Sequence, residues 1–385
     1  MGLDVEKRWV FMCQWGYEFV KKSEEKMIEK TAVIVSAKFT PGHISHLKAF
    51  YFLFNKLGYK TILLLNECYR NIFDENVCVK YLDEEWEETR ADVILIYNMS
   101  QIDTKIIKAL KGKSEKCKTL FVYHEPWYGI KKWVMDVMRR KVKLMVLLKN
   151  IVIHYYAVKL IRTVDIVLLP SEKAIDIYTR CDVKYNREYN EFPLIFTDET
   201  VGSAKEKRCY FSFIATADKE KNFPLFIEFI KSTLKNDSDF MSQIVTRSNI
   251  SEFWDKKLDK YVKEGRLVVQ AGRNLSNEEI NSALERSICT WLYYYHSTQS
   301  GVLARAFMCG SPVLCSTSGC FKNYVHGNNG VICKGNSMEE LYSAYKDICK
   351  NNEQMSREAK KSFAQFEYSN SVNAMREILE EGSLI

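Results

Sequence analysis

Short runs of apolar and β-branched residues recur along the chain, and each is followed by a segment with the spacing of an amphipathic helix. Uninterrupted apolar runs are typical of parallel strands that are buried on both faces. In the first half of the chain, the runs predict strands at residues 31–36, 61–65, 91–96, 119–123 and 164–169. Strands that alternate with helices in this way indicate a doubly wound α/β domain.

The same pattern begins again beyond residue 196, with strands expected at residues 209–214, 240–245, 266–270, 288–292 and 312–315. We therefore predict an α/β fold of two Rossmann-like domains with a boundary near residue 196. No low-complexity segment separates the halves, so we expect the domains to lie close together and to face each other across a cleft. Clefts between domains commonly bind ligands.

Composition narrows the class of protein. The 385 residues carry a net charge of +7, which favours anionic partners such as nucleotides, phosphates or acidic lipids. The twelve cysteines include no C-x-x-C pair, which argues against a zinc site or a dithiol redox motif and is typical of thiols in a reducing cytosol. The first residues include Asp4 and Glu6 and do not resemble a secretory signal.

The segment 298–314 has the pattern of a phosphate-binding helix start: a polar loop, a short helix and a turn into an apolar strand. Ser300 and Gly301 are suited to begin the helix, and Gly310 and Pro312 to end it. The first N–H groups of a helix have no partner within it, and with the positive end of the helix dipole they attract phosphate. Similar turns also merely connect strands to helices, and the residues alone leave both interpretations open.

Other candidates in the second half also follow predicted strands. Lys219 and Lys221 lie in the loop after the first of these strands, where a lysine can reach a diphosphate as a point charge. Gly272 permits a tight turn beside a ligand, and Arg273 and Arg247 can meet a phosphate or a base. Each residue is also consistent with a solvated surface turn.

In the first half, Gly42 and His43 follow one predicted strand, and His124 and Glu125 follow another, so both pairs should face the expected cleft. A glycine lets the backbone approach a substrate, and a histidine or glutamate can orient a sugar hydroxyl or act as a base. The alternative is structural, with a strand–helix turn at Gly42 and a buried hydrogen-bonding side chain at His124.

Residues 129–163 contain nine basic residues and a single acid, Asp136, among bulky apolar residues. Lysines interrupt every apolar run, so the segment lacks the roughly 20 apolar residues that span a bilayer. A basic, apolar helix of this kind favours the surface of an anionic membrane, here its inner, cytoplasmic face. The alternative is a pair of helices packed within the domain. No nucleic-acid recognition motif is visible, so nucleic acid is not an expected partner.

Taken together, these segments resemble the retaining glycosyltransferases of the GT-B fold that are called group 1 or family 4. The resemblance covers nearly the whole chain from residue 31 and is carried by motifs at residues 164–171, 191–198, 306–314 and 327–330. It implies an acceptor-binding first domain, a second domain that binds a nucleotide-sugar donor, and a last helix that crosses back to the first domain. The corresponding residue ranges are 1–196, 197–365 and 366–385.

The resemblance also implies roles for individual residues, with the donor diphosphate lying on the helix after the Ser300–Gly301 loop. The catalytic candidates are His124, Glu125 and Lys221. The acceptor-binding candidates are Gly42 and His43. The donor-binding candidates are Thr216, Arg247, Gly272, Arg273, Gln299, Ser300, Gly301, Val302 and Arg305. No metal and no further cofactor are expected.

The chain departs from the pattern of the group at several positions. The group usually has a pair of glutamates in an E-x7-E motif, where this chain has Ser297 and Arg305. Thr216 stands where an arginine is common, while Lys221 fits the usual lysine. A subset of these enzymes has the same Thr-Gln-Ser-Gly loop, here at residues 298–301.

We therefore expect a retaining transferase that moves a sugar from a nucleotide-sugar to a saccharide or lipid-linked saccharide, as in the biosynthesis of bacterial surface polysaccharides. One alternative is a nucleotide-sugar epimerase on the same fold, which would need no acceptor and no surface for lipid. A second alternative is a catalytically weak partner protein that binds nucleotide-sugar, which the missing acidic pair favours.

Overall fold

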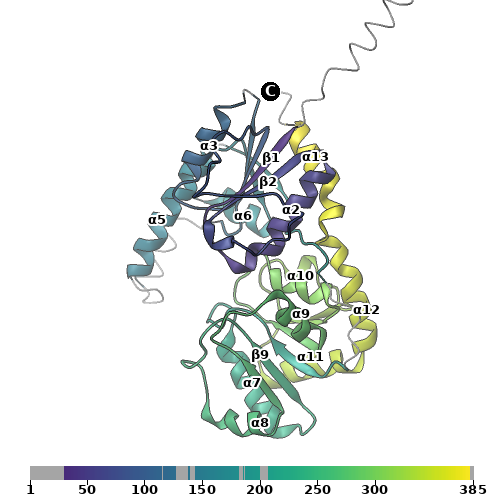
Figure 1. Cartoon of the computed structure of the whole chain (residues 1–385). Coiled ribbons are helices and arrows are strands. Elements are labelled where there is room, and N and C mark those ends of the chain that lie inside the picture. Colours follow the sequence, from purple (N-terminus) through teal and green to yellow (C-terminus); the bar gives the residue numbers. More distant parts are fainter. Residues whose placement is uncertain are drawn as a thin grey trace, which may run out of the picture.

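The computed structural model describes residues 30–114, 116–126, 138, 144–181, 185, 187–199 and 207–381. Within these residues the chain forms two parallel β-sheets, each covered by helices, and they make up the two bodies that lie one above the other in Figure 1. This arrangement confirms the predicted α/β class with two Rossmann-like domains.

The first sheet has the strand order β3-β2-β1-β4-β5-β6-β7. Its strands are β1 (Thr31–Ser36), β2 (Lys60–Leu65), β3 (Val79–Tyr81), β4 (Val93–Asn98), β5 (Lys118–Val122), β6 (Ile166–Leu169) and β7 (Glu188–Glu191). Successive residues of β1 point to opposite faces, and both faces are buried, because Ile34 packs in one hydrophobic cluster while Val33 and Val35 pack in another. Burial on both sides explains the continuous apolar run.

The helices of the first domain cover both faces of its sheet. They are α2 (Ile44–Lys56), which follows a short 3-10 turn at Pro41–His43, α3 (Asp103–Lys111), α5 (Leu144–Ile161) and α6 (Glu172–Arg180). Apolar residues of α2 pack in the cluster with Ile34, whereas those of α3, α5 and α6 pack in the cluster with Val33.

The second sheet has the strand order β10-β9-β8-β11-β12-β13. Its strands are β8 (Tyr210–Phe213), β9 (Met241–Val245), β10 (Leu267–Gln270), β11 (Ser287–Leu292), β12 (Val313–Ser316) and β13 (Gly330–Cys333). The surrounding helices are α7 (Phe223–Asn236), α8 (Asp259–Lys263), α9 (Asn277–Glu285), α10 (Gly301–Met308), α11 (Met338–Lys350) and α12 (Asn352–Ser362). An aromatic core that includes Phe211, Phe226 and Trp291 fills this domain.

The chain passes between the domains twice, along two adjacent segments. The N–H of Phe196 donates to the carbonyl of Phe366 at 2.7 Å, and the N–H of Tyr368 donates to the carbonyl of Phe196 at 3.0 Å. Helix α13 (Val372–Glu381) then packs beside α2, and Met375 is fully buried in the cluster with Ile34. Figure 1 shows α12 and α13 following one side of the molecule from the second domain to the first.

Three strands were not predicted, and all lie at or near the edges of their sheets. They are β3, β7 and β13. Edge strands contact water, and β7 accordingly reads Glu-Tyr-Asn-Glu and is largely exposed, so it lacks the apolar run on which the prediction depends. In the described ranges, no helix combines the length and the apolar character that crossing a membrane requires.

Candidate functional site

The N-terminus of α10 has the geometry of an anion site. The side-chain oxygen of Ser300 accepts a hydrogen bond from the N–H of Leu303 at 3.2 Å, so Ser300 is the N-cap residue. In the part of the chain that the structure describes, the N–H groups of Gly301 and Val302 have no hydrogen-bond partner, and both residues are partly exposed. Two free donors at the positive end of a helix dipole favour a bound phosphate.

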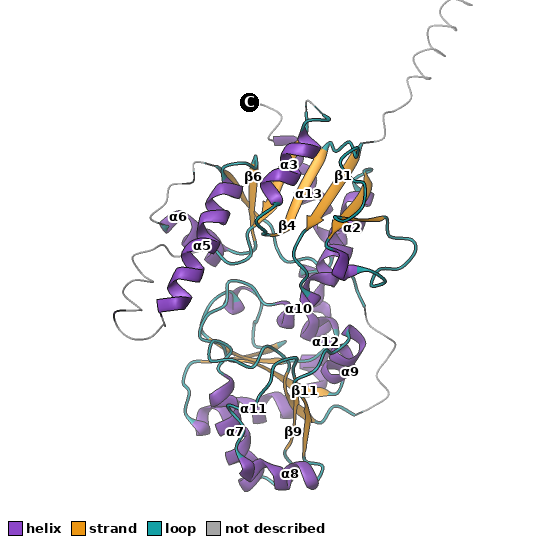
Figure 2. Cartoon of the chain, turned by 60° about the vertical axis from the view of Figure 1, so that its left-hand side comes forward, coloured by secondary structure: helices purple, strands orange, loops and turns teal. Residues whose placement is uncertain are grey.

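The loop before α10 is held by residues of both domains. The Ser171 hydroxyl donates to the carbonyl of Thr298 at 2.6 Å, and the Thr298 hydroxyl donates to the carbonyl of His124 at 3.1 Å. On the other side, the N–H of Cys320 donates to the carbonyl of Ser297 at 3.1 Å. The loop therefore lies at the contact between the domains, and Figure 2 shows α10 between the first sheet and the rest of the second domain.

His124 links this loop to the first domain through its side chain as well. Its Nε2 lies 3.0 Å from the carbonyl oxygen of Tyr97, and its Nδ1 lies 3.3 Å from Oε1 of Gln299. Because a carbonyl oxygen can only accept, Nε2 carries the proton. Burial lowers the pKa of His124, so the ring is neutral near pH 7 and Nδ1 is an acceptor. The Gln299 amide must therefore turn its NH2 group toward this ring.

Two further histidines pack around the Tyr97 ring beside His124. The centroids of the His43 and His124 rings are 5.5 Å apart, and those of His46 and Tyr97 are 5.7 Å apart. Burial and the nearby His124 and Lys38 lower the pKa of His43 to about 3, and burial also lowers the pKa of His46. All three histidines are thus neutral near pH 7, and a neutral imidazole can both donate and accept a proton.

Lys221 lies where the ends of β8 and β11 meet. Its Nζ sits 4.6 Å from the centre of the Tyr294 ring. Burial raises the pKa of the Cys320 thiol to about 11, and the charge of Lys221 acts in the opposite direction, which indicates that the ammonium lies near the Ser297 end of the loop. The backbone turns at Asn222, whose φ of 54° is in the left-handed region that asparagine tolerates. The ammonium therefore lies over the Tyr294 ring, beyond the end of β11.

The three arginines among the candidates are all engaged with groups of the protein. Arg247 donates to the carbonyl of Leu275 at 2.7 Å, and the exposed Arg273 pairs with Glu279 at 2.5 Å. Arg305 is buried and donates from Nη1 to Asn281 Oδ1 at 2.9 Å.

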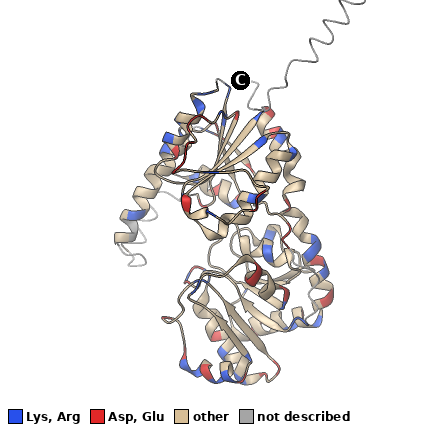
Figure 3. Cartoon of the chain, in the orientation of Figure 1, with Lys and Arg blue, Asp and Glu red and all other residues tan. Residues whose placement is uncertain are grey.

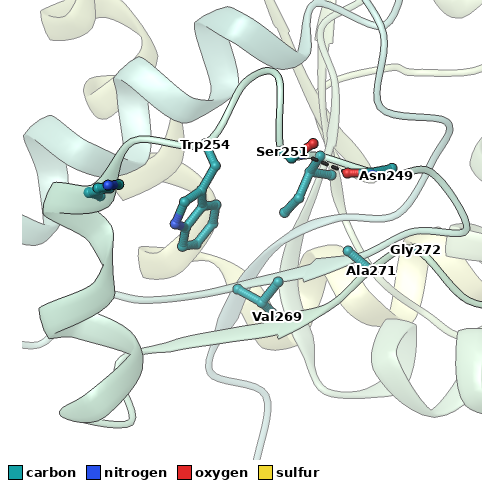
Figure 4. Close-up of a pocket in the computed structure, with 8 residues that line it drawn as sticks. Asn249, Ser251, Trp254, Val269, Ala271 and Gly272 are labelled. Atoms are coloured by element: carbon teal, nitrogen blue, oxygen red, sulfur yellow. Dashed lines mark hydrogen bonds between the residues drawn. The ribbon is translucent and has the colours of Figure 1, made fainter.

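Gly272 lines a pocket of ≈ 590 Å³ at the end of β10, together with Asn249, Trp254 and Val269 (Figure 4). Gln243 on β9 bonds to the carbonyl of Ala283 in α9, which shows which face of the sheet α9 covers. Val269 pairs with Ile244, the residue after Gln243, so Val269 points to the opposite face. The part of the pocket formed by Val269 thus lies on the face of the sheet opposite α9.

Three other candidates lie in exposed positions after strands. Thr216 follows β8, Gly42 follows β1 and Glu125 follows β5, next to His124. No atom lies within 4 Å of the position that a Cβ would take at Gly42, so the backbone there is open to a ligand. Among the described residues, no group of three or more histidine, cysteine, aspartate or glutamate side chains is arranged to hold a metal ion.

The basic segment at 129–163 lies partly outside the described residues, which include position 138 and residues 144–163. Helix α5 carries an apolar stripe on its exposed side, where Met145 is 74%, Leu148 50%, Val152 52% and Tyr155 62% exposed. In Figure 3, the helix α5 carries blue basic positions but little or no red for acidic residues, and it extends away from the body of the first domain.

The sequence does not reveal the polar partners of Arg305, which are the buried Ser45 and Asn281 and the partly buried Glu199. They lie 260, 24 and 106 positions away in the chain, and nothing in a local pattern links them. A signal was nevertheless present, because an arginine at an apolar helical position requires a buried counter-charge.

Comparisons with known proteins support a specific family for the second domain. Residues 196–364 match the family described as glycosyl transferases group 1. No curated protein matches the chain.

Several solved structures share the fold over most of the chain. Sucrose-phosphate synthase from Thermosynechococcus elongatus aligns with a TM-score of 0.65 and 11% identity, covering 92% of this chain and 99% of its own. HepE from Anabaena, in complex with UDP, aligns with a TM-score of 0.64 and 12% identity, covering 91% and 100%. The pneumococcal O-GlcNAc transferase GtfA, in complex with UDP and GlcNAc, aligns with a TM-score of 0.62 and 11% identity, covering 93% and 100%. At these identities the likeness shows the fold.

Proposed function

We propose that this chain, whose residues 196–364 match the glycosyl transferases of group 1 and which shares its fold with solved glycosyltransferases, transfers a sugar with retention from a nucleotide-sugar to a saccharide acceptor. The observation that carries the proposal is the pair of free N–H groups at Gly301 and Val302, on a helix whose preceding loop is bound by both domains. The expectation of retention comes from the resemblance to the group.

In the proposed reaction, the donor diphosphate lies on the first turn of α10. The N–H groups of Gly301 and Val302 and the ammonium of Lys221 stabilise the negative charge that develops as the sugar leaves. His124 and Glu125 follow β5 on the side of the first domain, from which the acceptor approaches. His124 orients a sugar hydroxyl by exchanging its bond to Gln299 for one to the acceptor, and the exposed Glu125 is the candidate base.

Binding of nucleoside diphosphates tests the proposal directly. Because HepE is solved with UDP and UDP-glucose, UDP is the first ligand to try, followed by GDP, ADP and dTDP. We expect one of them to raise the melting temperature and Lys221→Met to weaken its binding, because a ligand that binds only the native state stabilises it. The control is Lys235→Met, which changes an exposed lysine in the last turn of α7. If no diphosphate binds the wild-type chain, the proposal is wrong.

A donor-binding partner without transferase activity is the second candidate. It is favoured by Ser297 and Arg305, which occupy the positions of the usual acidic pair. Donor binding without hydrolysis or transfer across a broad acceptor panel would support it, whereas incubation of the donor alone would reveal an isomerised sugar if the chain were an epimerase.

We further propose that the exposed face of α5 rests on an anionic membrane and that the acceptor is a lipid-linked saccharide, as in bacterial surface polysaccharide assembly. Support comes from the apolar stripe of Met145, Leu148, Val152 and Tyr155, which a helix in water would not normally expose. Lys149 and Lys159 are exposed on the same helix, and residues 144–163 contain no acid. Such a helix lies in the interface with its apolar side in the lipid and its lysines at the headgroups.

Vesicle sedimentation tests this surface. Lys149→Gln with Lys159→Gln should reduce binding to vesicles that contain phosphatidylglycerol, by about fivefold for each lysine. Leu148→Ser with Val152→Ser should reduce binding to the same vesicles through lost apolar contact. Lys105→Gln with Lys108→Gln, on the exposed side of α3, is the matched control and should change nothing. Equal binding by all variants would exclude α5 as the membrane surface.

A further inference from the structure

Arg305 joins α10 to the first domain through a buried polar cluster. Its Nη1 donates to Asn281 of α9, its Nη2 donates to the Ser45 hydroxyl of α2, and Nη2 also lies 3.5 Å from Oε2 of Glu199 in the segment between the domains. Arg305 is 8% exposed, and the side chain of Glu199 is 20% exposed. Four separate parts of the chain thus meet at one guanidinium.

The same cluster is closed by Asn277. Its side-chain amide donates to Ser45 Oγ at 3.2 Å and to Glu199 Oε2 at 3.3 Å. The Asn281 amide donates in turn to the backbone carbonyl of Glu199 at 3.3 Å. The carboxylate of Glu199 therefore has two partners besides its own segment, and the positive charge of Arg305 is compensated within the cluster.

Arg305 also lies on the same face of α10 as Gly301, the first residue of the helix. Gly301 and Arg305 are four residues apart and so share a face of the helix. A methyl group on Gly301 would lie 3.7 Å from Phe196 Cζ and 3.8 Å from His46 Nε2, and His46 is the neighbour of Ser45 on α2. One face of α10 therefore packs on α2 and on the segment between the domains. Its contacts are with ring side chains at Gly301 and with polar and charged groups one turn later, at Arg305.

We propose that Arg305 is a positioning residue, which with Glu199 and Ser45 fixes the N-terminus of α10 against the first domain and does not itself bind the donor. The inference rests on the proposed donor site at α10, since that is the turn being positioned. It departs from the role in donor binding that the sequence suggests for this residue. The fork of a guanidinium is required because two groups on different elements, Asn281 and Ser45, accept from different nitrogens.

The experiment compares Glu199→Gln, Arg305→Met and the double variant in the full chain. The readouts are thermal unfolding, the radius of gyration from small-angle X-ray scattering, and UDP binding by calorimetry. We expect each single variant to lower the melting temperature and raise the radius of gyration, and the double variant to do little more, because both residues act in one cluster. UDP affinity should change by no more than about twofold if, as proposed, no residue of the cluster binds the ligand.

The control pair is Lys231→Met with Asp255→Asn, a partly exposed ion pair within the second domain. It should leave the radius of gyration unchanged. The proposal is overturned if Arg305→Met weakens UDP binding by about tenfold or more, as loss of a charged hydrogen bond to phosphate would, while Glu199→Gln behaves as wild type. It is also overturned if no cluster variant alters the radius of gyration.

Two further measurements keep the test decisive. If Arg305→Met fails to fold, Glu199→Gln and Arg305→Lys can be measured in its place. Lysine keeps the positive charge but cannot donate from two separate nitrogens to Asn281 and Ser45. Absence of UDP, GDP, ADP and dTDP binding in the wild-type chain would count against the proposed function, whereas the scattering and unfolding results would still decide the positioning role.

Discussion

At the scale of single residues, Gly319 limits where the loop before α10 can lie. Its φ is +71°, and a Cβ at this position would lie 1.9 Å from the carbonyl oxygen of Ser297. Real Cβ atoms do not approach so closely, so only glycine allows the loop to rest here. The position of Ser297, and through it of Ser300, thus depends on a residue without a side chain.

We predict that Gly319→Ala lowers the free energy of unfolding by about 3 kcal/mol and weakens UDP binding, because Ser297 must move away. Gly327→Ala is the control: its φ is +78° but nothing lies within 4 Å of the new methyl group. It should cost only the backbone penalty of about 1–2 kcal/mol and leave UDP binding unchanged. Equal costs for the two variants in urea unfolding would show that the contact with Ser297 is not limiting.

The histidines around Tyr97 predict loss of stability in mild acid. The folded state holds the pKa of His43 at about 3, below the value of about 6.5 in an unfolded chain, so only the unfolded chain takes up the proton as the pH falls below 6.5. The stability is complete above pH 6.5 and decreases toward pH 3, by about 1.4 kcal/mol per pH unit for each histidine that stays neutral. Burial shifts His46 and His124 in the same direction.

Urea unfolding between pH 7.5 and 5.5 measures this slope, and His43→Gln should reduce it. Asp103 acts in the opposite direction, because burial raises its pKa to about 6 and its folded form takes up a proton before the unfolded one does. This contribution is common to wild type and variant and cancels in their difference. His326→Gln, at an exposed position, should leave the slope as it is. A slope that His43→Gln does not change would contradict the assignment.

At the scale of the elements, two helices have a serine as N-cap, but only one of these helices lies at the proposed donor site. Ser300 caps α10 between the domains, and Ser337 caps α11 with a capping box that includes Glu340. We predict that Ser300→Ala and Ser337→Ala each cost about 1 kcal/mol of stability. Only Ser300→Ala should also weaken UDP binding, because the first turn of α10 is the one that holds the free N–H groups. Weaker UDP binding in Ser337→Ala would mean that the effect is general.

The elements also show what a sequence can and cannot specify. The central strands were predicted because burial on both faces requires apolar runs, and Ser300 was predicted as a cap because capping is local. The edge strand β7 was not, since its side chains meet water. The partners of Arg305 depend on contacts 106 and 260 positions away in the chain, which no local pattern contains.

At the scale of the whole molecule, the first domain is built from two parts of the chain that are separated by the entire second domain. Residues that follow the second domain return to complete the core of the first, where Met375, Ile378 and Leu379 pack among residues of α2 and the first sheet. The two crossing segments are hydrogen-bonded to each other at Phe196. The first domain therefore requires the end of the chain in order to bury its own apolar surface.

We predict that Met375→Ala destabilises the first domain by about 2–5 kcal/mol, as expected for a cavity at a fully buried methionine. Hydrogen exchange should show lost protection in β1, β2 and α2, although these lie more than 300 positions away in the chain. Met355→Ala, in α12, makes the same change in the core of the second domain and should lower protection there first. Unchanged protection in α2 with Met375→Ala would mean that the first domain is stable without α13, and a fragment that ends at residue 196 should then fold alone.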